Sequence, residues 1–400
     1  MKKINNFING KISEPESNTY SKVYDPSTGE AIAECLLSDH NDLNLALNSS
    51  KKAFLPWSNT TPLKRSRIIS NFKNIIESNI EDLAKTVSLE HGKTIDDAKG
   101  SITRGLEVVE FACGIPHLLK GEFSQNVGTG IDSWSIRQPL GICAGITPFN
   151  FPAMVPMWMF PLAIASGNCF ILKPSEKNPS CALKLAELFT KAGLPDGVFN
   201  VVNGDREIVE NLINSDEISS ISFVGSTPVA KSIYTQSANA GKRVQALGGA
   251  KNHLVVMPDA NLDQAVDGII GAAFGSAGER CMAVSVAVAV GGIGDQLIDA
   301  VQSKISKLKV APWTDTDSDM GPLISQEHLK KVKNYIQSGI NDGAKLVEDG
   351  RNLQLQGYEK GYFIGPTLFD NVNKNMKIYK EEIFGPVLSV VRAPTYNDAI

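Results

Sequence analysis

Cys281 is the side chain in this sequence that is best suited to nucleophilic chemistry. It lies in the stretch GSAGERCMAV, directly after Arg280 and among small residues. A neighbouring cation favours the thiolate form of cysteine, and Gly275 and Gly278 allow a ligand to approach the backbone closely. A small cysteine that only packs in a core is the ordinary alternative. The local pattern by itself leaves both interpretations open.

Asn150 is a candidate for the hydrogen-bond donor that such a nucleophile needs. Attack on a carbonyl carbon produces an oxyanion, which a preorganised side-chain amide can stabilise. Asn150 stands in TPFNFP, between two aromatic residues and two prolines, directly after an apolar stretch. Asparagine is also common in turns for purely conformational reasons. The motif therefore indicates either an oxyanion donor or a turn.

Two further motifs are suited to binding a nucleotide. LKPSE puts Lys173 and Glu176 at the end of an apolar stretch, and FVGST puts Gly225 and Ser226 between an apolar stretch and a predicted helix. In doubly wound folds, nucleotides bind at the carboxyl ends of the strands, where an acidic residue accepts ribose hydroxyls and a helix N-terminus binds pyrophosphate. FVGST lacks the G-x-G-x-x-G pattern, so it does not by itself identify a Rossmann site.

The elements that must position these residues follow from the apolar pattern. From Leu140 onward, short apolar stretches alternate with amphipathic ones, as expected for parallel strands joined by helices. The predicted strands are LGICAGIT, CFILK, FNVVN and ISSISFV, and residues 181–192 are predicted as a helix. A second series of this kind begins near Leu254, after the sequence GGAK. The fold class is therefore predicted to be α/β, with a doubly wound parallel sheet and a second α/β domain.

Composition excludes several other classes of protein. The chain has 400 residues, a formal net charge of −4 and 20% charged residues, so nucleic acid and anionic membrane surfaces are not expected partners. The most apolar stretch, residues 149–171, is interrupted by prolines and predicts no membrane span. The six cysteines form no C-x-x-C pair, which argues against a disulfide framework and a zinc site, and no metal is expected. The N-terminus resembles no secretory or transit signal, and we expect a cytoplasmic protein.

Taken in order, the motifs TPFNFP, LKPSE, FVGST, GERC and KEEIFGPV resemble those of the aldehyde dehydrogenase superfamily. The resemblance covers the whole chain. Within the superfamily, FNFPAMVPMWMFP, GAKNH and AGERCMA are similar to the CoA-acylating methylmalonate-semialdehyde dehydrogenases. That branch binds NAD and uses coenzyme A as a co-substrate, so the resemblance implies both for this chain.

The resemblance also implies a role for each matching residue. Cys281 would attack the aldehyde, and Asn150 together with the backbone N–H of Cys281 would hold the oxyanion. Glu176 beside a ribose would repel an added phosphate, which favours NAD over NADP. The residues that match cofactor contacts of the family are Thr147, Phe149, Lys173, Glu176, Gly225, Ser226, Glu382 and Phe384.

One departure from the wider superfamily bears on the fate of the acyl group. Hydrolytic members carry E-L-G-G-K, and Leu247 occupies the position of that glutamate in QALGGAKNH. Leucine cannot act as a general base for water, so the thioester should persist until the thiol of CoA attacks it. Arg104 and Arg280 match the pair that the family branch uses for a substrate carboxylate, although an ion pair with Glu107 is the ordinary alternative for Arg104.

The implied reaction is therefore oxidative decarboxylation, from methylmalonate semialdehyde to propionyl-CoA and from malonate semialdehyde to acetyl-CoA. The preference between the two substrates, and the pathway, valine or inositol breakdown, are left open.

His91 and His253 are not expected to be catalytic. An aldehyde dehydrogenase with a non-acidic substrate is the closest alternative. The chain ends at TYNDAI, within a predicted helix, so a folded but inactive fragment, truncated at its C-terminus, is a second alternative.

The same resemblance predicts the domain organisation. Residues 1–120 and 140–247 are expected to form an NAD-binding domain, and residues 121–139 an oligomerisation hairpin. Residues 248–400 are expected to form a catalytic domain that is incomplete at its C-terminus. The partners expected are the small aldehyde, CoA and further copies of the chain, as a dimer or a tetramer.

Overall fold

The computed structural model describes all 400 residues, which divide into two compact units. The first unit comprises Met1–Val23, Ile32–Val87 and Lys99–Gly248. The second comprises Tyr24–Ala31, Ser88–Ala98 and Gly249–Ile400. Two short segments before residue 120 thus belong to the second unit, which the expected domain organisation did not include. The functional labels given to the domains stay predictions.

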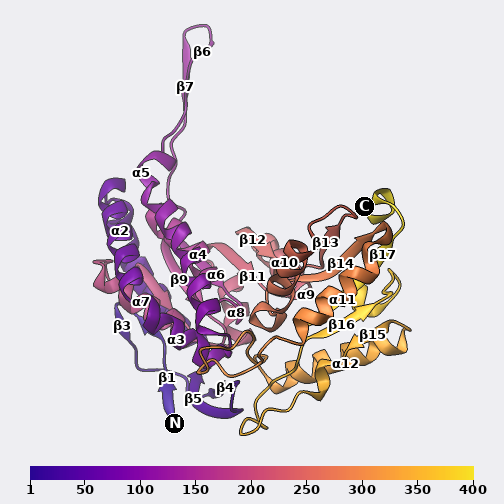
Figure 1. Cartoon of the computed structure of the whole chain (residues 1–400). Coiled ribbons are helices and arrows are strands. Elements are labelled where there is room, and N and C mark those ends of the chain that lie inside the picture. Colours follow the sequence, from indigo (N-terminus) through magenta and orange to yellow (C-terminus); the bar gives the residue numbers. More distant parts are fainter. The chain divides into compact units, whose positions relative to one another are not determined.

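The first unit contains most of the helices and a seven-stranded sheet (Figure 1). Its strands are β1 (Lys2–Ile4), β2 (Phe7–Ile8), β3 (Lys11–Ile12), β4 (Tyr20–Asp25), β5 (Glu30–Leu36), β6 (Phe123–Gly128), β7 (Ile131–Trp134), β8 (Ile142–Ile146), β9 (Cys169–Lys173), β10 (Phe199–Val201), β11 (Ile218–Val224) and β12 (Arg243–Leu247). Its helices are α1 (His40–Ser58), α2 (Pro62–Ser78), α3 (Ile80–His91), α4 (Ile95–Cys113), α5 (Ile115–Leu118), α6 (Met154–Ala165), α7 (Ser180–Lys191), α8 (Arg206–Asn214) and α9 (Thr227–Asn239). The last residues of β4 and α3, and the first residues of β5 and α4, belong to the second unit.

The seven strands follow the order β12-β11-β8-β9-β10-β2-β3. The five strands from β12 to β10 are parallel, whereas β2 and β3 are antiparallel additions at the edge. Strands β8 and β9 are buried along their whole length, which explains why ICAGI and CFILK read as continuous apolar runs. The predicted parallel sheet is therefore confirmed.

Helices cover both faces of this sheet. On one face, α1, α8 and α9 pack on alternate residues of the central strands, including Ile142, Ala144 and Ile146 of β8. On the other face, α2, α6 and α7 meet the sheet through a cluster of aromatic rings, which consists of Phe72, Phe160, Phe170, Phe189 and Phe199. Because side chains alternate between the two faces along each strand, consecutive residues pack in two separate cores.

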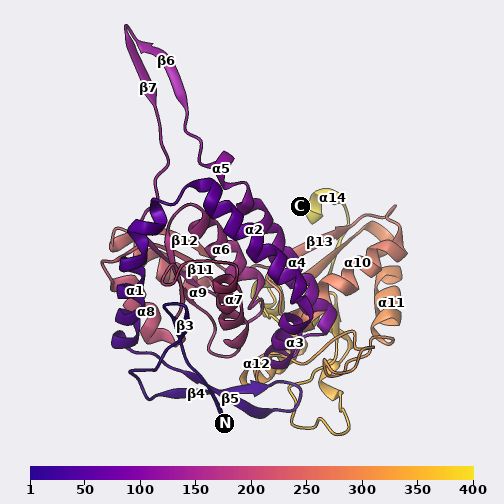
Figure 2. The ribbon, with the colours of Figure 1, turned by 90° about the vertical axis from the view of Figure 1, so that its left-hand side faces the viewer.

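A two-stranded hairpin extends from the first unit, away from its helices (Figure 2). Strands β6 and β7 pair with each other in antiparallel register, and almost every residue of both strands is exposed. The exposed apolar side chains of the hairpin and its base are Phe123, Val127, Ile131, Trp134 and Ile136. A row of exposed apolar groups with free strand edges is unusual on a lone chain.

The second unit is built around a five-stranded sheet of order β13-β14-β17-β16-β15. Its elements are β13 (Asn252–Val256), α10 (Leu262–Phe274), β14 (Val284–Val290), α11 (Gly294–Ile305), α12 (Gln326–Asn341), β15 (Lys345–Glu348), β16 (Thr367–Asp370), α13 (Lys377–Lys380), β17 (Val387–Ala393) and α14 (Tyr396–Ala399). The pairings are parallel except that between β15 and β16. The core of this unit lies between the sheet and helices α10, α11 and α12. No helix of the chain combines the length and the apolar character that crossing a bilayer requires.

Candidate active site

Cys281 follows a strained turn in the second unit. A 3-10 segment, Gly275–Gly278, connects α10 to the cysteine, and we call residues 276–281 the cysteine turn. Ser276, Ala277 and Gly278 all have left-handed backbones, with φ of 52°, 51° and 70°. A non-glycine residue in this conformation costs about 1 kcal/mol or more, so the surrounding contacts must hold the turn in place.

Two of these contacts explain the residue types of the turn. A Cβ atom at Gly278 would lie 2.4 Å from the carbonyl oxygen of Gly385, so only glycine fits. Asp97, in the first turn of α4, accepts the backbone N–H of Ser276 at 2.8 Å and also binds the guanidinium of Arg280. Asp97 therefore holds the cysteine turn at its first residue and again at Arg280.

The structure corrects the expected effect of Arg280 on the thiol. Arg280 is paired with Asp97, and its Nε atom is buried without a hydrogen-bond partner. Burial raises the pKa of the Cys281 thiol above its ordinary value, and the carboxylate of Glu382 raises it further. Sequence adjacency suggested a cation that stabilises the thiolate, but Arg280 contributes no such effect here because its side chain is engaged elsewhere.

Glu279 anchors the same turn from inside the core. Its side chain is fully buried, and Oε1 accepts the backbone N–H of Ile324 at 3.2 Å. Oε1 also lies 3.5 Å from Nε2 of His328, and Oε2 lies 3.7 Å from Nε2 of His91. Complete burial holds the pKa of His91 well below its ordinary value, and the charges of Lys93 and Arg280 lower it further, so His91 is neutral at neutral pH.

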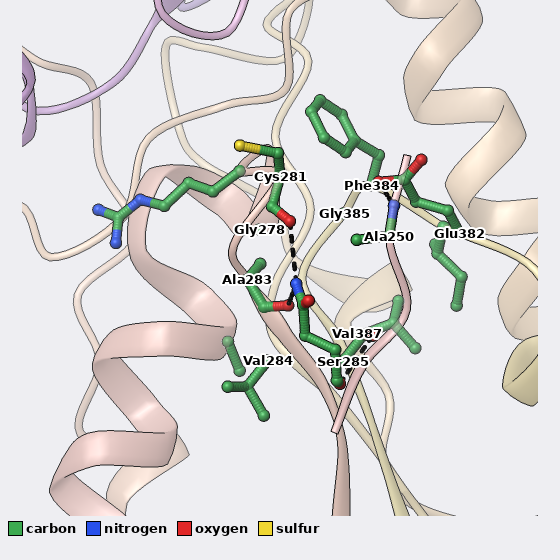
Figure 3. Close-up of a pocket in the computed structure, with 14 residues that line it drawn as sticks. Ala250, Gly278, Cys281, Ala283, Val284, Ser285, Glu382, Phe384, Gly385 and Val387 are labelled. Atoms are coloured by element: carbon green, nitrogen blue, oxygen red, sulfur yellow. Dashed lines mark hydrogen bonds between the residues drawn. The ribbon is translucent and has the colours of Figure 1, made fainter. Parts of the chain in front are cut away.

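Glu382 and Phe384 lie across a small pocket from Cys281 (Figure 3). We call residues 382–385 the Phe384 turn; Phe384 has a left-handed backbone, with φ of 62°. Glu382 accepts the backbone N–H of Ala250 at 3.2 Å. The pocket between these residues has a volume of only about 20 Å³, which is room for a single water molecule. Any aldehyde must therefore reach the sulfur of Cys281 from outside this pocket.

Lys251 is a neighbour of this pocket that the sequence motifs did not single out. Its Nζ donates to the carbonyl of Glu381 at 3.0 Å. Burial lowers the pKa of Lys251 to about 8, although the nearby carboxylate of Glu382 opposes the shift. Its place in the GGAKNH stretch was the available signal, but no role followed from sequence. A Cβ atom at Gly249 would lie 2.1 Å from the carboxylate of Glu382, so a side chain at this position would displace that carboxylate.

In the first unit, the cofactor candidates gather at one edge of the seven-stranded sheet. Strands β11, β8 and β9 are neighbours, and their carboxyl ends lead to Gly225, Thr147 and Lys173. The backbone N–H of Thr147 donates to the carbonyl of Lys173 at 3.1 Å, which joins two of these ends directly. The Nζ of Lys173 binds the carboxylate of Glu176 at 3.2 Å. Ser226 is exposed at the N-cap of α9 and makes no side-chain capping bond.

Asn150 is buried in the turn that follows β8, which we call the asparagine turn (residues 147–152). Asn178 holds this turn by donating from its side chain to the carbonyl of Phe149 at 2.6 Å. The ammonium of Lys177 lies 5.5 Å from the centre of the Phe149 ring. Both holding residues come from the LKPSEKNP stretch, so this stretch supports the asparagine turn as well as the strand-end residues.

Sequence reasoning missed an apolar groove near the same edge. It lies between α8 and α9, has a volume of about 420 Å³, and is lined by Val209, Ile213, Phe223, Pro228, Val229 and Ile233, among others. The amphipathic pattern of each helix predicts an inward face, but it does not tell which apolar residues will be left open to solvent.

Some proposed partners belong to different units. Cys281, Arg280, Glu382 and Phe384 lie in the second unit, and the remaining predicted site residues lie in the first. It therefore stays a prediction that Cys281 and Asn150 act on the same oxyanion. It also stays a prediction that Arg280 and Arg104, which is exposed on α4, bind the same substrate carboxylate. Leu247 ends β12 and is 45% exposed.

A thiol on a strained turn, together with strand ends suited to a nucleotide, agrees with one known group of enzymes. The sequence pattern of the aldehyde dehydrogenase family matches residues 12–400. The chain belongs to that family. It is therefore an oxidoreductase of the aldehyde dehydrogenase type, as the motifs predicted.

Relatives within the family confirm the fold and show which members of the family this chain is similar to. A malonate-semialdehyde dehydrogenase of Pseudomonas aeruginosa is 53% identical over 398 residues, which are 99% of this chain and 80% of that protein. A structure from Sinorhizobium meliloti, described as a methylmalonate-semialdehyde dehydrogenase complexed with NAD, is 53% identical with a TM-score of 0.99. The methylmalonate-semialdehyde dehydrogenase of Oceanimonas doudoroffii is 52% identical with a TM-score of 0.98. Each structure matches 100% of this chain, which covers 82% of theirs.

Proposed function

We propose that this chain is an NAD-dependent, CoA-acylating dehydrogenase of malonate or methylmalonate semialdehyde. The proposal assigns cofactor binding to the first unit and the chemistry of the thiol to the second. The single observation that carries the CoA part is the apolar side chain of Leu247, at the position where hydrolytic relatives activate water. The names of the relatives at about 50% identity support the substrate class.

The cofactor edge of the first unit fits the chemistry of NAD. The apolar groove between α8 and α9 is suited to a flat aromatic base, and it continues to Pro228, two residues after Ser226. The exposed N-terminus of α9 offers backbone N–H groups to a pyrophosphate. Lys173 and Glu176 can bind ribose hydroxyls, as donor and acceptor. Thr147 Oγ1 is buried without a hydrogen-bond partner, which leaves one further donor at this edge.

The residues of the chain have distinct tasks in the proposed oxidation. The sulfur of Cys281 attacks the aldehyde carbon, and the amide of Asn150 with the N–H of Cys281 stabilises the oxyanion. Bound NAD supplies the hydride acceptor. Glu382 and Phe384 position the nicotinamide side of the cofactor. The product on the protein is a thioester at Cys281.

The lack of a base at position 247 determines the next step. Water needs a general base to attack a thioester efficiently, and a leucine side chain cannot accept a proton. The thiol of CoA attacks instead and releases Cys281. An acyl group that carries a carboxylate on the α-carbon of the thioester loses carbon dioxide readily. The electron pair of the broken bond passes into the thioester carbonyl, and the resulting enolate takes up a proton. The products are then acetyl-CoA or propionyl-CoA.

Arg280 supports an acidic substrate through its unused donor. Its Nε atom is buried and has no hydrogen-bond partner, so a carboxylate that reached it would satisfy a group that is costly to leave unpaired. The ion pair with Asp97 favours the competing proposal, an aldehyde without a carboxylate, because Arg280 is already neutralised. Arg104 would supply the second guanidinium.

The deciding experiment measures NADH formation from malonate semialdehyde and NAD, with and without CoA. We expect sustained turnover only with CoA, and a burst close to one NADH per active site without it. Equal sustained rates would contradict the CoA proposal. Leu247→Glu is the matched variant, and it should acquire turnover without CoA because it restores a base. Propanal in place of malonate semialdehyde tests the competing proposal, which predicts equal or better turnover with propanal.

The exposed hairpin supports a proposal about assembly. Phe123, Ile131 and Trp134 are each more than half exposed on strands β6 and β7, and a second copy of the chain would cover them. Gel filtration with light scattering should therefore give the mass of a dimer or a tetramer. Replacing Phe123 and Trp134 with serine should shift that mass to the monomer, whereas an unchanged mass would contradict this role of the hairpin.

A further inference from the structure

His328 lies between the cysteine turn and the Phe384 turn. It stands in the first helical turn of α12, where Ser325 caps the helix by accepting the backbone N–H of His328 at 3.2 Å. From there the ring reaches the Phe384 turn, since Nε2 lies 2.6 Å from the carbonyl oxygen of Phe384. The same atom lies 3.5 Å from Oε1 of Glu279, two residues before Cys281.

The chemistry of these partners fixes the direction of the hydrogen bond. A carbonyl oxygen can only accept, so Nε2 of His328 must carry a hydrogen and donate it to Phe384. Glu279 cannot move away from His328 freely, because it is fully buried and also accepts the backbone N–H of Ile324. The ring of His328 also meets the ring of Phe384 edge to face, at 6.3 Å between centroids. One side chain therefore contacts both turns.

Both turns need outside support. Phe384 and Ser276 have left-handed backbones without being glycine, and each conformation is unfavourable on its own. A second link joins the same two turns, because Gly278 packs directly against the carbonyl of Gly385. The cysteine turn and the Phe384 turn are thus connected to each other, and the side chain of His328 reaches both of them from a third element, α12.

We propose that His328 is a positioning residue that holds the Phe384 turn in register with Cys281. This inference rests on the proposed NAD-dependent chemistry at Cys281. The proposed role of His328 is indirect. It acts on the cofactor through the backbone of Phe384, and on Cys281 through Glu279.

The test compares His328→Leu, His328→Asn and His328→Gln with the wild-type chain. The amide nitrogen of glutamine can occupy the place of Nε2, whereas asparagine is too short and leucine has no donor. Calorimetric titration with NAD should give a dissociation constant at least fivefold weaker for leucine and asparagine, and within twofold of wild type for glutamine. Alkylation of Cys281 by iodoacetamide without cofactor should become at least threefold faster for leucine and asparagine, because the half-buried thiol is held less firmly.

Gln337→Leu is the matched control on the same helix, since the side chain of Gln337 forms hydrogen bonds with Asn341 and Arg351, away from both turns. It should change neither readout. Folded His328 variants with wild-type NAD affinity and wild-type alkylation would overturn the inference. Failure of the wild-type chain to bind NAD would instead contradict the proposed function, and alkylation would still report on the link to the cysteine turn. The His328→Asn variant keeps the test valid if the His328→Leu variant does not fold.

Discussion

The asparagine turn and the cysteine turn are held by different kinds of interaction. The hydrogen bonds that hold the first are neutral and run from Asn178 to Phe149 and from the backbone of Thr147 to that of Lys173, and the ammonium of Lys177 adds a contact with the Phe149 ring. Charged side chains hold the second, with Asp97 on one side and the buried Glu279 on the other. The asparagine turn follows directly from a buried strand, whereas the cysteine turn begins with three left-handed residues that need external support.

This difference shows what each turn can be used for. A turn that continues a buried strand is rigid at little cost, and it suits a side chain that must only donate a hydrogen bond. A turn held by charged side chains can present a half-buried thiol, because its anchors, Asp97 and Glu279, bind other residues of the turn. The cost is dependence on several distant residues. The following changes test that dependence, from the largest expected effect to the smallest.

Replacing the nucleophile should have the largest effect. Cys281→Ser should lower NADH formation by about a thousandfold or more, because a hydroxyl is a far weaker nucleophile than a thiolate at neutral pH. Stability should stay close to that of wild type. Cys113→Ser is the control, since Cys113 is also partly exposed but lies in α4, and its activity should stay within twofold. A Cys281→Ser enzyme with a substantial steady rate would contradict the assignment.

Adding a side chain within the left-handed segment should have the next largest effect, this time on stability. Gly278→Ala should lower the free energy of unfolding by more than about 3 kcal/mol, because it adds a backbone clash to an unfavourable φ. Gly241→Ala is matched in backbone, with φ of 71° against 70°, but a Cβ there meets nothing within 4 Å. It should cost only about 1 kcal/mol. Urea denaturation of both variants measures the difference, and equal losses would show that the contact with Gly385 is unimportant.

The anchors of the two turns allow a direct comparison. Asp97→Ala should cost about 2 to 3 kcal/mol, because it leaves the buried part of Arg280 and the N–H of Ser276 without their acceptor. Asn178→Ala should cost about 1 kcal/mol, the usual contribution of a neutral hydrogen bond. Asp97→Asn keeps an acceptor for Ser276 and should fall between them. If denaturation curves gave Asn178→Ala the larger loss, the contrast between charged and neutral anchoring would be wrong.

The smallest effect concerns the protonation of Cys281. Burial favours the neutral thiol, so the pKa lies above the ordinary value of 9.0 and less thiolate is present at pH 7 than for an exposed cysteine. The rate of iodoacetamide alkylation should therefore rise about tenfold per pH unit from pH 7 and reach half of its maximum only above pH 9. Mass spectrometry of the Cys281 peptide follows the reaction. A midpoint below pH 8 would mean that a cation activates the thiol after all.

The asparagine turn could be predicted from sequence because its signals are local. Continuous apolar runs predicted β8 and β9, and the residues after each run were correctly expected at the strand ends. Parallel neighbours then bring Thr147 and Lys173 together without further information. The same pattern predicted the α/β fold, since buried parallel strands and amphipathic helices have different apolar periods.

The support of the cysteine turn could not be predicted in this way. Asp97 and Ser276 are 179 positions apart, and His328 and Phe384 are 56 positions apart. Nothing in the neighbourhood of Asp97 or His328 distinguishes them from the many charged residues on helix surfaces. The pairing of Arg280 shows the same limit, because adjacency in sequence suggested that its charge acts on Cys281, while the side chain points to Asp97.

The left-handed segment before Cys281 also limits how this enzyme can change in evolution or in the laboratory. Positions 276 and 277 favour residues that tolerate positive φ, so glycine and asparagine should survive there in a mutant library, and valine, isoleucine and proline should be lost. Position 278 should accept glycine alone, because of the backbone of Gly385. Diversity in aldehyde preference must then come from side chains that approach the thiol from elsewhere. A designer who wishes to alter the substrate should leave this segment untouched and vary the surfaces that face it.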